Sequence, residues 1–239
     1  MSINEIDRIR AVYARYARLE PRRDKYRSSP GYTMCLTERD AHIRRLLGEL
    51  APNLARCRVL DAGCGYGSLL NLFHEQGAAA DKLFGIDLLP NRIRAARQHY
   101  PSITFQEGNA EELDFPDKWF DLVTAFTVFS SILDDRMAAN VALEITRVLN
   151  PGGAIIWYDM RYPNPWNRNV RPMTKARIRE LFPTFKLDLQ SLTLLPPVAG
   201  RLGSGSNTTY PLLARVPFLR SHYMGLLRFK LSRIGGAPG

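Results

Sequence analysis

The stretch that decides the fold runs Val59-Leu60-Asp61-Ala62-Gly63-Cys64-Gly65-Tyr66-Gly67-Ser68-Leu69-Leu70. It reads as a buried strand, a glycine-rich turn and the opening of a helix. Glycine has no Cβ, so the backbone can turn tightly there and come close to a ligand. The free N–H groups at the start of the helix offer a polar cradle. A tight turn without any ligand would use similar residues, so the glycines alone leave both interpretations open.

The next apolar strand ends in an acid, and this spacing favours a nucleoside cofactor. Leu83-Phe84-Gly85-Ile86-Asp87 places that acid about 20 residues after the glycine loop, where a carboxylate accepts hydrogen bonds from ribose hydroxyls. Two cofactors would use this layout, a nicotinamide dinucleotide and S-adenosylmethionine. The dinucleotide fingerprint expects its third glycine one position later, where the chain has Ser68. The glycine spacing, together with Asp61 as a partner for an ammonium group, favours the methyl donor.

Five motifs in order resemble the core of the class I S-adenosylmethionine-dependent methyltransferases, between about Cys57 and Asp159. They are the glycine loop Val59 to Gly67, the strand end Gly85-Ile86-Asp87, the loop Glu107 to Pro116, the strand Phe120 to Phe126 and the turn Arg147 to Gly153. The resemblance implies a cofactor site. In this site, the methionine portion of the cofactor is lined by Asp61, Gly63 and Gly65, and the ribose is bound by Asp87. Leu88 packs on the adenine ring, which is bordered by Asn109, Ala110 and Glu111. Phe126 lies where the fourth strand passes beneath the cofactor.

Alternating strands and helices predict an α/β fold with helices on both faces of a mostly parallel sheet. We expect strands over 58–61, 82–87, 103–106, 120–126, 154–159 and 186–194. We expect core helices over 68–76, 91–99, 136–149 and 177–182. The resemblance adds a seventh, antiparallel strand near 221–230, which gives a Rossmann-like doubly wound sheet of seven strands. Residues 1–54 are predicted to form a helical N-terminal cap, with one helix over 3–19 and another capped by Thr37. Residues 55–239 then form the methyltransferase domain, which carries an insertion over 195–220.

Composition limits the class of protein. The chain has 239 residues and a net charge of +10, and its start lacks the pattern of a secretion signal. No apolar run reaches the length of a membrane span. Cys35, Cys57 and Cys64 show no metal-ligand spacing, so no metal is expected and a reducing, cytoplasmic setting is predicted. The basic charge attracts phosphorylated substrates, nucleic acid or acidic lipid, or simply forms solvated faces.

The segment Trp157 to Arg168 is the candidate for the acceptor side, because it leaves the fifth strand at the ligand edge of the sheet. Asp159 or Tyr162 would orient or deprotonate a hydroxyl, while Arg161 and Arg168 would hold an anionic acceptor. A proline-rich loop with solvated arginines is an equally good interpretation. Two tyrosines before the core, Tyr26 and Tyr32, are further candidates to close over the donor.

An obvious histidine base is missing from the sequence pattern. Many relatives carry one or two histidines after the fourth strand, where this chain has Phe129-Ser130-Ser131-Ile132-Leu133-Asp134. Three histidines fall on predicted helices and His222 opens the final strand. We therefore expect none of them to be an easy replacement.

These features favour methyl transfer from S-adenosylmethionine to a hydroxyl, or an amine, of a small-molecule, sugar, or lipid- or nucleotide-linked acceptor. An RNA methyltransferase is the nearest competing function, supported by charge. It is disfavoured because no nucleic-acid module or Asn-Pro-Pro-Tyr-like motif appears near Thr124 to Val128. A noncatalytic S-adenosylmethionine-binding protein and a nicotinamide oxidoreductase also stay open. The insertion over 195–220 is predicted to pack, to cover the substrate or to touch a membrane surface, and the oligomeric state stays open.

Overall fold

The computed structural model describes residues 4–19, 27–50, 53–165 and 167–230. Its centre is a seven-stranded sheet in the order β3-β2-β1-β4-β5-β7-β6. The strands are β1 (Val59–Ala62), β2 (Leu83–Asp87), β3 (Thr104–Glu107), β4 (Phe120–Phe126), β5 (Leu149–Met160), β6 (Phe185–Leu194) and β7 (Arg220–Phe229). Strands β1 to β5 pair in parallel, and β7 runs antiparallel to both β5 and β6. The predicted Rossmann-like sheet with an antiparallel last strand is confirmed.

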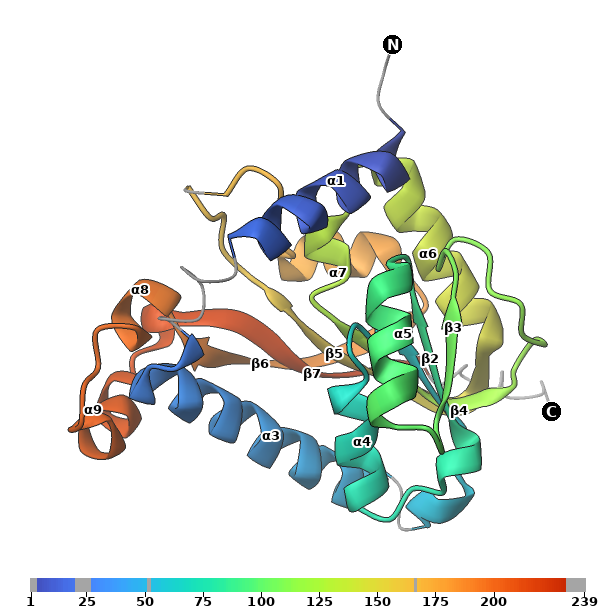
Figure 1. Cartoon of the computed structure of the whole chain (residues 1–239). Helices are drawn as coiled ribbons and strands as arrows, with labels where there is room; N and C mark the ends of the chain where they lie inside the picture. Colours follow the sequence, from blue (N-terminus) through green and yellow to red (C-terminus); the bar gives the residue numbers. More distant parts are fainter. Residues whose placement is uncertain (1–3, 20–26, 51–52, 166, 231–239) are drawn as a thin grey trace, which may run out of the picture.

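Helices cover both faces of this sheet (Figure 1). They are α1 (Glu5–Arg18), α3 (Pro30–Leu50), α4 (Ser68–Glu75), α5 (Pro90–His99), α6 (Asp135–Val148), α7 (Lys175–Leu181), α8 (Pro196–Ala199) and α9 (Ser206–Leu213). The alternation of apolar side chains on the strands divides the core in two. One apolar cluster joins the sheet to α6 and α7, and the other joins it to α3, α4 and α5. No helix among the described residues is long and apolar enough to cross a membrane.

Helix α1 lies over the segment that follows β4 and is attached to it by polar contacts. The Arg8 guanidinium donates to the Ser131 carbonyl at 2.6 Å, and the Tyr13 and Ser131 hydroxyls lie 3.1 Å apart. The Glu5 carboxylate accepts from the Leu133 N–H at 2.6 Å. Ile9, on the same side of the helix, joins the core cluster of the sheet. The amphipathic pattern of α1 therefore serves to cover the edge of the sheet where ligands are expected.

Helix α3 corrects one prediction. The sequence suggested that Thr37 caps this helix, but α3 already begins at Pro30. Proline fits the first helical position because its missing N–H would be unpaired there. The Ser29 hydroxyl accepts from the Tyr32 N–H at 3.2 Å and so supplies the cap. Thr37 lies inside the helix.

Gly31 allows α3 to pack closely against α8. A Cβ built on Gly31 would lie 1.9 Å from the backbone oxygen of Ala199. Because backbone atoms of a packed helix cannot yield as a side chain does, we expect Gly31→Ala to lower the free energy of unfolding by about 1–3 kcal/mol. Gly48, in the same helix, has no atom within 4 Å of such a Cβ. Gly48→Ala should instead raise the free energy of unfolding by about 0.5–1 kcal/mol. Urea unfolding of both variants measures this difference in stability. Equal stabilities would contradict the close packing.

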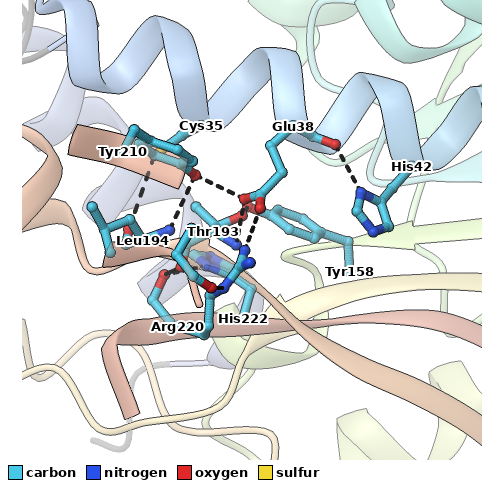
Figure 2. A network of polar contacts seen from close by, with 11 residues as sticks. Cys35, Glu38, His42, Tyr158, Thr193, Leu194, Tyr210, Arg220 and His222 are labelled. Carbon is cyan, nitrogen blue, oxygen red and sulfur yellow. Dashed lines mark hydrogen bonds and ion pairs between the residues drawn. The ribbon is translucent and has the colours of Figure 1, made fainter. Parts of the chain in front are cut away.

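The insertion over 195–220 folds into α8, α9 and a short 3-10 helix, and it packs on α3 rather than extending into solvent. A partly buried polar network joins α3 and α9 to β6 and β7, as Figure 2 shows. The Glu38 carboxylate accepts from the Tyr210 hydroxyl at 2.7 Å and from the Thr193 N–H at 3.0 Å. It also forms an ion pair with Arg220. Packing, one of the three roles expected for this segment, is therefore observed for most of it.

Candidate active site

A cavity of about 110 Å³ lies at the carboxyl ends of β1, β2 and β4. Six of the predicted cofactor residues line it, namely Gly63, Asp87, Leu88, Asn109, Ala110 and Phe126. Ile86, Met137 and Val141 add apolar wall, and α1 contributes Ile9 and Tyr13 from above. We call this space the donor cavity. Chain segments far apart in sequence build it, because the parallel strands all end at the same edge of the sheet.

Asp87 is the polar centre of the donor cavity. It is buried, and its two carboxylate oxygens accept from the Gly65 and Leu89 N–H groups, each at 2.9 Å. The Arg92 guanidinium lies 3.8 Å from the carboxylate and 4.2 Å from the ring centre of Tyr13. Asp87 therefore fixes the glycine loop and keeps a negative charge at the tip of β2.

Three predicted cofactor residues, Asp61, Gly65 and Glu111, do not line the donor cavity. Asp61 is buried and accepts from the Thr124 hydroxyl at 2.5 Å; burial raises the pKa of its carboxyl to about 7, against the effect of that hydrogen bond. The Glu111 carboxylate accepts from the amides of Asn109 and Asn140, both at 3.0 Å. These placements make Glu111 a support of the adenine-side loop.

A second cavity, of about 670 Å³, adjoins the donor cavity. The two share Ile9, Tyr13, Thr127 and Ser131 in their walls. The second cavity lies among α1, the ends of β5 and β7, the loop after β5, and α8. We call it the acceptor cavity. Its position continues the donor cavity toward the loop that the sequence singled out.

The acceptor cavity is mostly apolar. Its walls include Val12, Met160, Val170, Val198 and the prolines of α8. Among the described residues that line it, Arg8 alone carries a permanent charge. The Arg8 Nε and Nη2 atoms each donate to the Glu5 carboxylate at 2.7 Å, so the charge is compensated. The cavity therefore suits a largely apolar molecule without a net charge.

Thr127 is a site residue that was not predicted from the sequence. It follows β4, lines both cavities, and has a φ of +55°. Such a conformation is unfavourable for a β-branched residue and is kept only where surrounding contacts enforce it. The Thr127 N–H donates to the Tyr158 carbonyl at 2.7 Å, which holds the turn against β5. No local sequence signal marks this strain, because threonine itself disfavours it.

The predicted acceptor-side residues divide between cavity wall and support. Tyr162 lines the acceptor cavity, whereas Asp159 lines neither cavity. The Asp159 carboxylate is fully buried and accepts from the Ser130 N–H at 3.0 Å and the Met160 N–H at 2.8 Å; burial raises its pKa to about 6. Asp159 thus holds the turn after β4 and lies outside the lining of both cavities, and its catalytic role stays a prediction.

The remaining acceptor-side expectations find less support. Arg161, Arg168 and Tyr32 line neither cavity, so an anion clamp built from the two arginines does not face the acceptor space. The Arg161 guanidinium lies over the ring of Tyr162, 4.5 Å from its centre, and fixes that ring instead. Tyr26 lies outside the described residues. No metal-binding group of histidine, cysteine or acidic side chains occurs in the described parts of the chain.

Comparison with known proteins agrees with this geometry. A family model described as a methyltransferase domain matches residues 59–153. Residues 59–153 therefore form a methyltransferase domain, and the chain has the class I methyltransferase fold. The match begins at β1 and ends within β5, so it covers the strands whose tips form the donor cavity. S-adenosylmethionine is the cofactor of this domain.

Two curated relatives and one solved structure illustrate the proteins to which this chain is similar. The chain is 33% identical to a demethylmenaquinone methyltransferase of Symbiobacterium thermophilum over 119 residues, 47% of this chain and 45% of the relative. It is 36% identical to a fatty-acid O-methyltransferase of Mycolicibacterium smegmatis over 116 residues, 46% of this chain and 41% of the relative. The matched segment thus spans less than half of either relative. A methyltransferase structure from Archaeoglobus fulgidus shares the fold at a TM-score of 0.58 and 17% identity, covering 83% of this chain and 99% of that one.

The residues at the donor cavity fit this cofactor. A Cβ built on Gly63, whose φ is +78°, would lie 2.7 Å from Val128 Cγ2, so only glycine leaves the turn in its present shape. The carboxylate of Asp87 suits ribose hydroxyls, and the apolar wall with Asn109 suits an adenine ring.

Proposed function

We propose that this methyltransferase transfers a methyl group from S-adenosylmethionine to a hydroxyl of a small, largely apolar acceptor held in the acceptor cavity. One observation carries the proposal: the donor cavity opens onto a larger apolar cavity, and four residues form walls of both. A donor and an acceptor in adjoining spaces are oriented toward each other, which converts an encounter into an intramolecular step.

The residues of the chain position the cofactor and the acceptor and do not themselves activate the methyl group. When bound, the sulfonium of the cofactor supplies an already activated methyl group. Asp87 would hold the ribose, and Gly63 would let the backbone approach the methionine portion. Thr127 would fix the boundary between the two cavities, while Ile9 and Tyr13 of α1 exclude water from above. Exclusion of water protects the donor from hydrolysis and strengthens polar contacts inside the site.

The character of the acceptor follows from the wall of its cavity. The ion pair of Arg8 with Glu5 leaves no uncompensated permanent charge among the described lining residues, so we replace the expected anionic acceptor by an uncharged one. The two curated relatives are named for demethylmenaquinone and fatty acids, which are also largely apolar. A quinol-like or long-chain acceptor therefore agrees with the apolar cavity and with the apolar molecules for which the relatives are named.

Incubation with methyl-labelled S-adenosylmethionine tests the proposal. The acceptors to compare are alkylated phenols, an isoprenoid quinol, a long-chain alcohol, a long-chain fatty acid and a transcribed tRNA. We expect label transfer to at least one of the uncharged apolar hydroxyl compounds. Transfer to RNA alone, with a steep dependence on salt, would replace the proposal by an RNA methyltransferase. Absence of transfer to every compound in this panel would contradict it.

A larger side chain in the acceptor cavity should weaken the binding of the acceptor and leave the binding of the cofactor unchanged. Val12 of α1 lines the acceptor cavity but not the donor cavity. We expect Val12→Trp to raise the KM of the acceptor about ten-fold or more, because an indole occupies its space, while the Kd of S-adenosylhomocysteine changes less than two-fold. Leu143→Trp, at an exposed position of α6, is the matched control and should alter neither value. A selective loss of donor affinity in Val12→Trp would show that the cavities are assigned the wrong way round.

A further inference from the structure

His222 lines the acceptor cavity, although its place in the sequence suggested no role for it. It lies near the start of β7, where it pairs with Met160 of β5 on one side and Leu192 of β6 on the other. Its ring is stacked on Tyr158, with ring centres 4.5 Å apart and planes only 3° apart. Tyr158 in turn contacts Phe126 of the donor cavity at 5.4 Å between ring centres. A row of three rings thus connects the donor cavity to His222.

The hydrogen bonds around His222 determine which ring nitrogen carries the proton. The Ser221 hydroxyl donates to the Thr193 carbonyl at 3.0 Å, and its oxygen lies 2.7 Å from His222 Nδ1. A serine hydroxyl has one hydrogen, and a carbonyl oxygen only accepts. Both contacts are therefore satisfied when Nδ1 carries the proton and donates to Ser221. This leaves a lone pair on Nε2, for which no hydrogen bond is found within the described chain.

We infer that His222 Nε2 is the hydrogen-bond acceptor for the hydroxyl of the methyl acceptor and takes up its proton during transfer. The inference rests on the proposed function and names the catalytic residue of that same site. Arg8, the one permanently charged side chain among the described lining residues, solely donates. Within the described part of the wall, His222 is thus the one neutral nitrogen base.

The transfer forms two bonds, from the acceptor oxygen to the methyl carbon and from Nε2 to the proton, and breaks two. The acceptor oxygen forms a bond to the methyl carbon, and the carbon–sulfur bond breaks with its electron pair left on sulfur. The O–H bond breaks as the hydroxyl proton passes to Nε2, and the imidazolium later returns that proton to solvent. Alkylation makes the hydroxyl proton strongly acidic, so even a weakly basic imidazole can take it.

The surroundings keep the imidazole neutral. Burial and the positive charge of Arg39 on α3 lower the pKa of His222 to about 3. The other groups against the ring are the Tyr158 phenol, whose hydroxyl bonds to Thr193 at 2.8 Å, and the Ser221 hydroxyl. On the β6 side the neighbour is Leu192, which does not titrate. The Nε2 lone pair is therefore available throughout the range from pH 5 to 9. In this range, titration of His222 should cause no pH dependence of the wild-type rate.

Two substitutions test the assignment, in the full chain with the best hydroxyl compound found in the labelling panel. His222→Asn keeps an N–H donor for Ser221 but removes Nε2, and His222→Gln places an amide near the Nε2 position without a base. We expect kcat to fall about 10- to 100-fold in both, with the Kd of S-adenosylhomocysteine within two-fold of wild type. His222→Gln should keep the acceptor KM closer to wild type. His74→Asn, on α4 and outside both cavities, is the matched control and should keep wild-type kcat.

A series of para-substituted phenols of increasing acidity adds a readout that a purely structural role would not move. The defect of His222→Asn should shrink as the phenol becomes ionised in solution, since no proton then has to be taken up. An equal defect for every phenol, or wild-type kcat in His222→Asn, would overturn the inference. If the wild-type protein methylates none of the panel, the proposed function itself fails.

A measurement without turnover examines the same nitrogen. In protein with ¹⁵N-labelled histidine, long-range ¹H–¹⁵N spectra should show one histidine protonated on Nδ1 and unprotonated on Nε2 down to about pH 5, and His222→Asn should remove that signal. A proton on Nε2 of His222 would overturn the inference.

Discussion

Asp87→Ala should weaken the binding of S-adenosylhomocysteine about 100-fold. Two charge-assisted hydrogen bonds to ribose hydroxyls, each worth about 1.5 kcal/mol, together amount to about 3 kcal/mol. The substitution also frees the Gly65 and Leu89 N–H groups, which now donate to this carboxylate at 2.9 Å each. The glycine loop thereby loses its attachment to the tip of β2. Isothermal titration calorimetry measures the affinity, and thermal unfolding shows whether the fold is kept.

Two controls assign that loss to the ribose. Asp81→Ala removes an exposed acid from the chain just before β2 and should leave the affinity unchanged. An analogue of S-adenosylhomocysteine without both ribose hydroxyls should bind wild type and Asp87→Ala almost equally. If Asp87→Ala binds the complete ligand within three-fold of wild type, the carboxylate does not hold the ribose.

Gly63→Ala is expected to lower the same affinity at least ten-fold. The residue has a φ of +78°, which costs a residue with a Cβ about 1–2 kcal/mol, and the new methyl would lie 2.7 Å from Val128 Cγ2. Both Gly63 and Val128 line the donor cavity, so relief of this contact must move its wall. Calorimetry with S-adenosylhomocysteine again gives the measurement.

Gly77→Ala distinguishes the effect of an unfavourable backbone conformation from the effect of a steric contact with the new methyl group. Gly77 has a φ of +99°, but nothing lies within 4 Å of a Cβ built there, and it is outside both cavities. This variant should lose stability and keep its donor affinity. Adding Val128→Ala to Gly63→Ala should recover part of the affinity, because it removes the atom that the new methyl meets. Wild-type affinity in Gly63→Ala would show that the loop has room which the structure does not indicate.

The predicted cofactor residues line the observed cavity where a short stretch of sequence determines their position. The period-two apolar pattern of each strand and the helical pattern that follows it fix a parallel sheet, and such a sheet brings the strand ends together. Gly63, Asp87 and Phe126 all stand at the ends of strands, so their meeting follows from the pattern. Asp61 belongs to β1 as well, but its carboxyl accepts from the Thr124 hydroxyl and does not line the cavity, a detail that periodicity does not contain.

The acceptor side could not be predicted in the same way. His222 and Met160 are 62 positions apart and become neighbours only through the pairing of β5 with β7. Val12 and Tyr13 reach the site because α1 attaches to Ser131 by polar contacts from a distant part of the chain. The positive φ of Thr127 runs against its local preference and is held by the hydrogen bond that its N–H donates to the Tyr158 carbonyl of β5.

By itself, then, the sequence determined the sheet, its helical layers and the donor end of the site, since each of these follows from short-range periodicity and from glycine and acid at strand ends. The tertiary structure decided which side chains face the acceptor, the start of α3 at Pro30 and the burial of Asp159. The reason is that these depend on contacts between segments far apart in the chain, whose energies no local stretch of residues encodes.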